Sequence, residues 1–509
     1  RMTELKFVII LLSFCVCISS SNGKKAELEE FYRWKQLSFK GLPLDKNHNS
    51  SDPFLVTYNN VPMSVSHYKG KLFITVPRRA PGIPSVLYYI PDDLPAGSSP
   101  SLKPYPDYKT NELHPEQKPD KKRIVSIYRT RVDDCGKLWF VCTGALEQNG
   151  VVQVQPPSIW IIDLETDSVI RRYEIPKDIV EQGRGIISLK IDVQKDKCHE
   201  AHAYISDFLH QKIYVYSFEK NRMWSFSHFY LNYEPEFTKF DFDGFKYQWF
   251  DGVFSVTLAK RNADGFRRAF FHPMSSNSEF EVSTRTLQNE TVSTIPEAYK
   301  SHFVKLGNRG PLSQSTLHDF DDKTGSVFFA LIAKSAVSCW NSKTLLTPES
   351  QGIVAQDDHT MNYPVDLSVY SGTVWTLTNT LPRFIYGKLD TNEYNFRILR
   401  GNTKELIKGT VCEPKHFAHG RKVEHDNHEQ DVVFPGDIFH EMSEDNEEFI
   451  PYNNVPMSVA HYKDKLIITV PRRKPGIPST LNYVSTNLPQ GSSPSLRPYP
   501  DAKTNKLHV

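Results

Sequence analysis

The sequence predicts an all-β protein, arranged either as an array of sandwiches or as a β-propeller. Apolar runs between residues 58 and 400 are short and rich in β-branched and aromatic residues, and Asp-Gly, Ser-Gly, Asn-Gly or Pro-Gly turns bound nearly all of them. Helical periodicity over more than ten residues is nearly absent. Examples of the expected strands are Lys71–Val76, Leu138–Val141, Ile159–Asp163, Lys212–Ser217, Gly325–Leu331 and Thr373–Leu377.

The length of the chain favours six blades. A chain of 509 residues is too long for one simple core. Dividing about 385 residues by about 60 per blade gives about six blades, on the repeat lengths of propellers. We therefore expect a six-bladed β-propeller.

The composition argues against two classes of partner. Lys plus Arg number 61 and Asp plus Glu 59, so the formal net charge is only +2. Bulk binding of nucleic acid or acidic lipid needs a clear basic excess. With 31 Phe, 24 Tyr and 7 Trp, the chain also has far more aromatic residues than disordered chains carry. We expect no nucleic-acid partner and no membrane partner.

The first 23 residues resemble a secretory signal peptide. Arg1 and Lys6 precede an apolar stretch from Phe7 to Ser19, and small residues up to Gly23 follow it. The alternative is a buried N-terminal strand. Export predicts a secreted, extracellular glycoprotein, and Asn49 and Asn289 fit the N-glycosylation pattern.

A segment near the start of the chain recurs near its end. Residues 451–509 repeat residues 57–115, so that YNNVPMSVSHYKGKLFITVPRRAPGIPS returns as YNNVPMSVAHYKDKLIITVPRRKPGIPS. The spacing is far too long for one repeat of a propeller. We interpret 451–509 as a truncated copy of a domain, either a true fusion or a piece of a neighbouring gene. Residues 413–450 are then a polar, His-rich linker.

Cysteine usage excludes a zinc cluster. Cys15 and Cys17 lie in the signal peptide, which leaves five of the seven cysteines, an odd number, in the mature chain. No CxxC and no Cys-rich cluster is present, which argues against a zinc site. We expect neither a metal nor a cofactor.

No standard catalytic motif is present: the sequence lacks GxSxG, HExxH, a P-loop and GxGxxG. Asp207 and Asn379 are candidates for the axial residues of calcium-dependent hydrolytic propellers, but their spacing selects neither. Asp207 stays a ligand-binding candidate, with a hairpin-turn cap as its alternative. For Arg78-Arg79, we expect a solvated strand end rather than a place in a site.

Several short motifs, in order along residues 24–412, resemble the insect yellow and major royal jelly protein family. They are Phe31-Tyr32-Arg33-Trp34-Lys35, Asn60-Val61-Pro62, Val76-Pro77-Arg78, Asp134-Cys135-Gly136-Lys137-Leu138-Trp139, Gln155-Pro156-Pro157-Ser158, Ala203-Tyr204-Ile205-Ser206-Asp207, Arg309-Gly310-Pro311, Ser338-Cys339-Trp340-Asn341 and Asn395-Phe396-Arg397-Ile398. The Gln-Pro-Pro-Ser segment is similar to the branch of the family proposed to convert dopachrome.

The resemblance implies a secreted six-bladed propeller with an axial channel. It also implies two disulfides, Cys135 with Cys198 and Cys339 with Cys412. Cys142 remains, at a position where family members usually carry Asp. A buried thiol is the expected state of this residue, and its presence puts any inherited activity in question.

For function, the resemblance implies melanin and cuticle pigmentation chemistry, with dopachrome conversion, a tautomerisation, as the expected reaction. No general base can be named from the sequence. The alternatives are a non-catalytic binder of biogenic amines or catechol-derived ligands, and a structural cuticle protein. By analogy with amine-binding salivary relatives, the candidate ligand-binding residues are Asn395, Thr378, Phe254 and Phe396, with Asp207 added from the search above.

Overall fold

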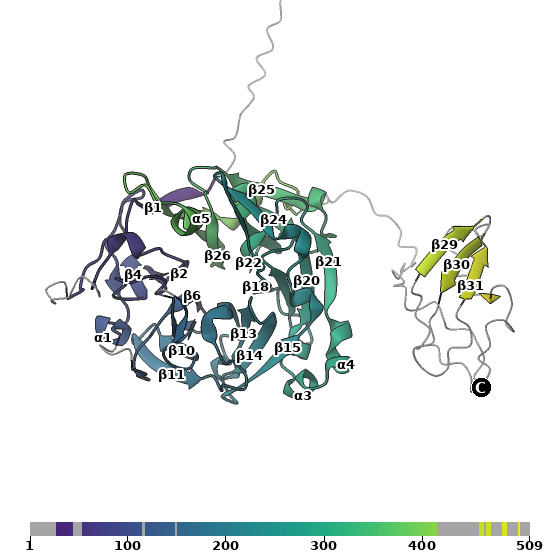
Figure 1. Cartoon of the computed structure of the whole chain (residues 1–509), viewed down its shortest axis with the longest axis horizontal. Coiled ribbons are helices and arrows are strands. Elements are labelled where there is room, and N and C mark those ends of the chain that lie inside the picture. The colour runs from purple at the N-terminus through teal and green to yellow at the C-terminus, as the bar shows by residue number, and fades with distance from the viewer. Residues whose placement is uncertain are drawn as a thin grey trace, which may run out of the picture. The chain divides into compact units, whose positions relative to one another are not determined.

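Six four-stranded antiparallel sheets form the first part of the chain, which confirms the all-β, six-bladed prediction (Figure 1). The structure is a computed structural model that describes residues 27–43, 53–113, 118–147 and 150–414, together with four strands near the C-terminus. The predicted signal peptide, Asn49 and nearly all of the predicted linker lie outside the described residues.

Blades 1 to 3 follow one another along the chain. Their strands are β2 (Ser64–Tyr68), β3 (Lys71–Thr75), β4 (Leu87–Pro91) and β5 (Lys103–Pro104); β6 (Ile127–Val132), β7 (Lys137–Cys142), β10 (Ser158–Asp163) and β11 (Ser168–Glu174); and β12 (Ile186–Asp192), β13 (His202–Asp207), β14 (Lys212–Ser217) and β15 (Arg222–Ser227). A short hairpin, β8 (Ala145–Leu146) with β9 (Val152–Gln153), interrupts blade 2.

Blades 4 to 6 complete the ring. Their strands are β18 (Val253–Leu258), β19 (Arg268–Pro273), β20 (Ser278–Ser283) and β21 (Val304–Asn308); β22 (Ser315–Asp321), β23 (Ser326–Leu331), β24 (Ala336–Asn341) and β25 (Gln351–Gln356); and β26 (Pro364–Tyr370), β27 (Thr373–Asn379), β28 (Phe396–Asn402) and β1 (Glu29–Trp34). The hairpin of β16 (Lys239–Phe242) and β17 (Phe245–Gln248) precedes blade 4.

The helices are all short and lie outside the blades' strands. They are α1 (Tyr108–Asn111), α2 (Thr284–Leu287), α3 (Glu290–Ser293), α4 (Pro296–Tyr299), α5 (Leu381–Tyr386) and α6 (Thr403–Ile407). Among the described residues, none of the helices is long and apolar enough to cross a membrane.

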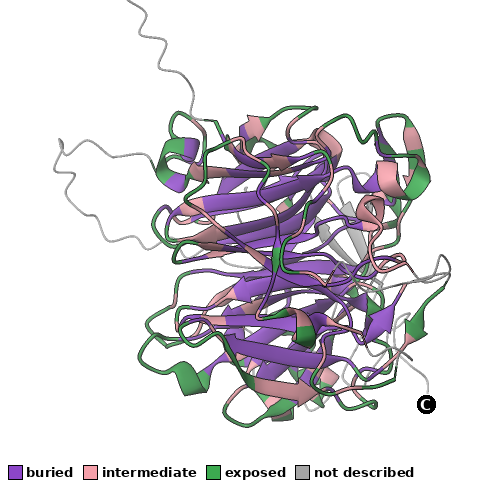
Figure 2. Cartoon of the chain, turned by 90° about the vertical axis from the view of Figure 1, so that its left-hand side faces the viewer, coloured by how far each residue is buried: buried purple, intermediate pink, exposed green. Residues whose placement is uncertain are grey.

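Strands β2, β6, β12, β18, β22 and β26 are the innermost of their blades, and each contacts the innermost strand of the next blade (Figure 1). Central strands are buried on both faces because each sheet is covered by two neighbouring sheets. All residues of β18 and β23 are buried, whereas the residues of the outer strand β11 are exposed or intermediate. Figure 2 shows buried residues along the strands inside the molecule and exposed residues mainly in the loops at its edge. Burial on both faces explains why the central strands are continuous apolar runs in the sequence.

The N-terminal strand closes the ring. β1 pairs antiparallel with β28, so the last blade combines strands from both ends of the described propeller. Two ion pairs accompany the register, from Arg397 Nε to Glu30 Oε2 and from Arg400 Nε to Glu29 Oε2, each at 2.9 Å. Closure by a strand from the other end of the chain keeps the first and last blades from separating.

Both disulfides implied by the resemblance form. Cys135, in the turn between β6 and β7, bonds to Cys198 ahead of β13 and so links blades 2 and 3. Cys339 on β24 bonds to Cys412, which follows α6 and blade 6. Each closes a loop worth about 4 kcal/mol in the chain-entropy model.

The C-terminal repeat forms a sheet of its own. The chain divides into two compact units, residues 1–416 and 417–509. In the second unit, β29 (Ser458–Tyr462), β30 (Lys465–Thr469), β31 (Leu481–Ser485) and β32 (Arg497–Pro498) pair in the same order as β2 to β5. The register matches as well, since Ser458 faces Thr469 as Ser64 faces Thr75. The repeated sequence therefore reproduces the backbone of blade 1.

Candidate active site

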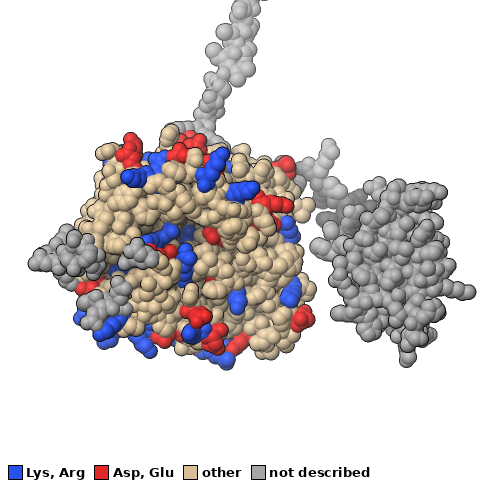
Figure 3. Space-filling view, viewed as in Figure 1, with Lys and Arg blue, Asp and Glu red and all other residues tan. Residues whose placement is uncertain are grey.

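Two cavities lie at opposite ends of the innermost strands. One, of about 410 Å³, is lined where these strands begin, and we call it the amino-end cavity. The other, of about 520 Å³, is lined where they end, and we call it the carboxyl-end cavity. Figure 3 shows a hollow near the centre of the propeller face in view, with Lys and Arg side chains around it.

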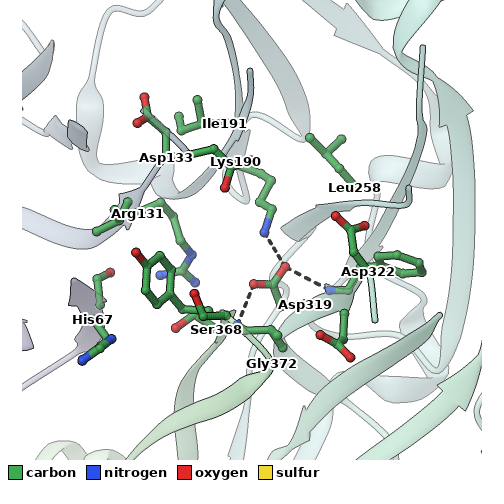
Figure 4. A pocket seen from close by; sticks show the side chains of 18 of the residues that line it. His67, Arg131, Asp133, Lys190, Ile191, Leu258, Asp319, Asp322, Ser368 and Gly372 are labelled. Carbon is green, nitrogen blue, oxygen red and sulfur yellow. Dashed lines mark hydrogen bonds and ion pairs between the residues drawn. The ribbon is translucent and has the colours of Figure 1, made fainter. Parts of the chain in front are cut away.

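Three charged groups in the wall of the carboxyl-end cavity already have partners within the protein. Lys190 Nζ lies 2.5 Å from Asp319 Oδ1 (Figure 4), and the Asp319 carboxylate also accepts from Thr257 Oγ1 and the Val369 amide. Arg131 Nη2 lies 2.8 Å from Asp366 Oδ1. Because these three charged groups and Asp366 pair with each other, they hold the blades together. They therefore have little hydrogen-bonding capacity left for a ligand.

The amino-end cavity differs in having aromatic walls. Its aromatic lining residues are Tyr128, Phe208, Trp249, Phe250, Phe254, Tyr363 and Tyr386. Such walls, with a few polar groups among them, are typical of sites for planar organic ligands.

Asp251 places a carboxylate in this cavity. It belongs to the segment between β17 and β18, where Ser275 Oγ accepts from the Asp251 amide and donates to the Trp249 carbonyl, which fixes the backbone. Burial raises the pKa of Asp251 to about 7, although Arg184 and Arg79 pull the pKa down. Within the described residues, no hydrogen bond or ion pair engages its carboxylate. A carboxylate with such a pKa can both accept and release a proton near neutral pH.

Two arginines line the same cavity as Asp251. Arg79 has no side-chain hydrogen bond or ion pair among the described residues, and Arg184 Nε lies 3.7 Å from Glu147 Oε2. Tyr128 donates its hydroxyl hydrogen to Glu147 Oε1. The cavity therefore combines a proton-transfer group with two guanidinium groups that attract negative charge.

Arg129 forms part of the inner wall of this cavity. It is fully buried, and its guanidinium donates to the Ile187 carbonyl at 3.1 Å and the Val365 carbonyl at 2.6 Å. It also lies over the Phe254 ring, with 5.2 Å between the guanidinium carbon and the ring centroid. Because these partners belong to three other blades, Arg129 crosses the centre of the propeller between the two cavities.

Aromatic residues from the β16–β17 hairpin region and from α5 form the rim. Trp249 Nε1 donates to Tyr386 Oη at 2.7 Å, and the Tyr247 and Tyr386 rings stack with centroids 4.9 Å apart. Arg383 on α5 pairs with Asp243 in the hairpin turn. Two segments far apart in sequence are thus joined beside the opening.

Of the residues predicted to bind a ligand, Phe254 lines the amino-end cavity. Thr378 is buried and donates to the Thr360 carbonyl, while Phe396 is buried in the core of blade 6. Asn395 is also buried, and its amide donates to the Lys35, Asp390 and Glu393 carbonyls. The last three lie outside both cavities, in positions that stabilise blade 6 and its loops.

Asp207 lies beneath the cavity rather than in its wall. Its Oδ1 accepts from the amides of Leu209 and His210, so it caps the turn between β13 and β14, as its alternative interpretation expected. The residues that it orders, Phe208 and Leu209, do line the cavity. Asn379 is likewise buried and donates to the Pro62 carbonyl.

Sequence reasoning missed Asp251, Arg184 and Glu147. The expectation of a solvated strand end at Arg78-Arg79 was wrong, because Arg78 is fully buried and Arg79 lines the cavity. Asp251, Arg184, Glu147 and Arg79 lie in connections outside the blades' strands, which bring them together only after the ring closes. One local signal was present for Arg184, because glycine on both sides of an arginine marks an unusual backbone position.

Comparison with known proteins now places the chain. The family model described as major royal jelly protein matches residues 125–412. L-dopachrome tautomerase yellow-f of Drosophila melanogaster is 42% identical over 409 residues, covering 75% of this chain and 94% of that protein. The chain belongs to the yellow and major royal jelly protein family. Protein yellow of Drosophila subobscura is 36% identical over 416 residues, covering 81% of this chain and 72% of that protein.

Among solved structures, virginiamycin B lyase from Staphylococcus aureus is similar with a TM-score of 0.35 and 10% identity, covering 68% of this chain and 96% of that one.

Cys142 has the buried thiol that the sequence predicted. Its sulfur accepts from the Val125 amide at 3.3 Å, and the residue lies outside the amino-end cavity.

Proposed function

We propose that this yellow-family protein is a dopachrome-converting tautomerase in melanin and cuticle pigmentation chemistry. The observation that carries the proposal is Asp251, an unpaired carboxylate with a pKa near 7, set among aromatic rings and two guanidinium groups. The similarity to a protein named L-dopachrome tautomerase supports the same reaction.

The reaction needs proton transfer and no redox partner. Dopachrome is a fused bicyclic ortho-quinone that carries a carboxylate, and its conversion to the isomeric dihydroxyindole carboxylic acid moves two hydrogens from ring carbons to the two quinone oxygens. A base must take a proton from carbon while electron density moves to the quinone oxygens, which are then protonated. Asp251 is the base in this proposal, since its pKa leaves it partly ionised at neutral pH.

The remaining groups of the cavity suit the developing charge. Arg79 and Arg184 would bind the quinone oxygens and stabilise the negative charge that grows there as Asp251 takes the proton. Trp249, Phe254 and Tyr363 would hold the planar ring system by stacking and exclude water around it. Orientation by rigid aromatic walls contributes to catalysis by keeping the carbon–hydrogen bond within reach of the base.

A second candidate function is the non-catalytic binding of aromatic amines. The observation in its favour is the Asp251 carboxylate beside Trp249 and Phe254, because an ammonium group pairs with a carboxylate and is attracted to aromatic faces. The two arginines of the same cavity act against it by like-charge repulsion.

We also propose that the protein is secreted and glycosylated. Two disulfides fit an oxidising compartment, and Asn289 is exposed, at the N-terminus of α3. Expression of the full chain in insect cells, followed by mass spectrometry of the medium, tests this. Cleavage near Gly23 and glycan on Asn49 and Asn289 are expected, and retention of an unprocessed chain inside the cell would refute secretion.

The deciding experiment follows the loss of dopachrome absorbance with the purified full chain, its Asp251→Asn variant and a boiled sample. Saturable acceleration that Asp251→Asn abolishes is expected. Binding of dopamine and serotonin is measured in parallel by calorimetry. Micromolar binding without acceleration of dopachrome loss would refute the tautomerase and support the amine-binding function. A folded protein with neither signal would refute both small-molecule functions and leave a structural cuticle role.

A further inference from the structure

The backbone at Arg184 is fixed by a glycine on each side. A Cβ on Gly183 would come within 2.1 Å of the Thr143 carbonyl oxygen, and one on Gly185 would come within 2.0 Å of Asp207 Oδ1. These approaches are far shorter than any real Cβ contact, so only glycine fits at either position. The Arg184 backbone is therefore clamped between blade 2 and the capped turn of blade 3.

Hydrogen bonds complete this clamp. The Gly183 amide donates to Gln153 Oε1 at 3.2 Å, while Gln153 Nε2 donates to the Thr143 carbonyl at 2.8 Å. On the other side, the Phe208 amide donates to the Gly185 carbonyl at 3.0 Å. Both sides of Arg184 are thus tied to neighbouring strands.

The Arg184 side chain is also held in place, by the Glu147 carboxylate. Glu147 Oε2 lies 3.7 Å from Arg184 Nε, Tyr128 donates to the other oxygen of Glu147, and the Glu147 amide donates to the Arg78 carbonyl. Tyr128 is in turn held by Thr75 Oγ1, which donates to its carbonyl at 2.5 Å. Strands of blades 1 and 2 therefore determine where the Glu147 carboxylate lies.

Stability does not account for this arrangement. The Arg184 side chain is 46% exposed, and exposed ion pairs contribute about 0–1 kcal/mol at most. What the arrangement does achieve is a defined position for one guanidinium group at the edge of a cavity that holds Asp251.

We propose that Glu147, oriented by Tyr128, is a positioning residue that holds the Arg184 guanidinium at the place where negative charge develops on the bound ring system. The inference rests on the proposed function, because that function supplies the charge. Glu147 also competes with Asp251 for the Arg184 guanidinium. It thereby prevents a direct ion pair between Arg184 and Asp251, the proposed base. Arg184 and Arg79 lower the pKa of Asp251, and Asp251 is one of the groups that raise the pKa of the Tyr363 hydroxyl.

The test compares Glu147→Gln and Tyr128→Phe with a matched pair of controls at the other end of the propeller. There, Tyr68 donates to Glu165 Oε1 at 2.7 Å, and Glu165 pairs with Lys69 at 2.5 Å. Tyr68→Phe and Glu165→Gln therefore remove the same kind of hydrogen bond and ion pair away from the amino-end cavity. All four variants are assayed for dopachrome conversion across pH, for melting temperature, and for binding of 4-nitrocatechol, a stable planar catechol whose colour reports its ionisation.

For Glu147→Gln we expect a fall in kcat of about 10-fold with a smaller change in KM, as for the loss of one group that stabilises transition-state charge. The acidic limb of the pH profile should move to lower pH, because the freed Arg184 approaches Asp251. Bound 4-nitrocatechol should ionise less readily. Tyr128→Phe should show the same changes more weakly, and the controls none of them.

Three results would overturn the inference. If wild type converts dopachrome and Glu147→Gln matches it in kcat, pH profile and 4-nitrocatechol colour, then Glu147 has no positioning role. A lower melting temperature without these changes would mean that the role is structural only. If the wild type itself neither converts dopachrome nor binds 4-nitrocatechol, the proposed function fails, and this inference fails with it.

Discussion

The Arg129 guanidinium, on β6 of blade 2, donates a hydrogen bond of 2.6 Å to the Val365 carbonyl on β26 of blade 6. A second bond, to the Ile187 carbonyl, reaches blade 3. One side chain thus joins three of the six innermost strands at the centre of the ring and forms part of the inner wall of the candidate active site. Burial lowers the pKa of Arg129 to about 10, which still leaves it charged at neutral pH.

Replacing this residue should weaken the whole ring. Arg129→Met removes the donors to Ile187 and Val365 and leaves two buried carbonyls and the Asp366 carboxylate with fewer partners. We expect a loss of about 3–5 kcal/mol in the free energy of unfolding, by analogy with broken buried ion pairs. Denaturant unfolding measures it, with Arg285→Met at an exposed ion pair as the control. Equal stability of the two variants would contradict the prediction.

Asp251 should link activity and stability to pH in opposite directions. Activity requires the ionised carboxylate, so kcat/KM should rise through a pKa of about 7. The folded pKa lies above the usual value of 3.8, so the folded protein binds the proton more tightly, and Asp251 lowers stability as the pH rises from about 4 to 7.

Asp251→Asn separates the two effects. It should reduce kcat by about 10²–10⁴-fold, the usual contribution of a general base. It should also raise the melting temperature above pH 7 and leave the melting temperature near pH 4 unchanged. A pH series of melting curves checks this, and an Asn variant that is less stable at pH 8 would show that the carboxylate is stabilising.

Two adjacent arginines should respond differently to mutation. Arg78 is fully buried and donates to five carbonyls, from Ile83, Pro84, Asn111, Ile124 and Val125, whereas the Arg79 side chain faces the cavity. Arg79→Gln should lower kcat/KM by about 10–100-fold with little change in melting temperature. Arg78→Gln should lower the free energy of unfolding by roughly several kcal/mol, because buried carbonyls lose their hydrogen-bond donor. Equal melting temperatures for the two variants would refute the distinction.

A buried cluster between blades 4 and 5 should make the propeller sensitive to acid. His272 Nδ1 lies 3.0 Å from Glu279 Oε2, and Arg309 Nη1 lies 2.6 Å from the same oxygen. Burial lowers the pKa of His272. For Glu279, burial is outweighed by His318 and His272, so its pKa is also lowered.

Both shifts act in the same direction. The unfolded chain binds protons at His272 below pH 6.5 and at Glu279 below pH 4.5, whereas in the folded chain both groups take up protons only at lower pH. The free energy of unfolding therefore falls as the pH drops through this range. We expect a melting temperature that declines from pH 7 to pH 4, and a shallower decline in His272→Gln. The exposed His199→Gln is the control, and a decline identical in both variants would contradict the assignment.

Local pattern was sufficient to predict the blades. Strands such as Lys212–Ser217 and Gly325–Leu331 were identifiable because a sheet covered on both faces needs a short, continuous apolar run that ends at a turn. The disulfide pairs followed from the family resemblance, and the structure confirms them. Asp207 was predicted as a ligand-binding residue, but it caps a turn, which was the alternative interpretation; its hydrogen bonds are local, to residues two and three positions ahead.

By itself the sequence determined the all-β class from local strand and turn patterns, the number of blades from its length, and the family from motifs that follow one another along the chain. The site depended on the tertiary structure, because Arg79, Glu147, Arg184 and Asp251 come from separate connections that meet only when the ring closes. The chemistry of Asp251 was decided there too. Its pKa follows from burial among aromatic rings and from two distant arginines, and no spacing along the chain encodes that surrounding.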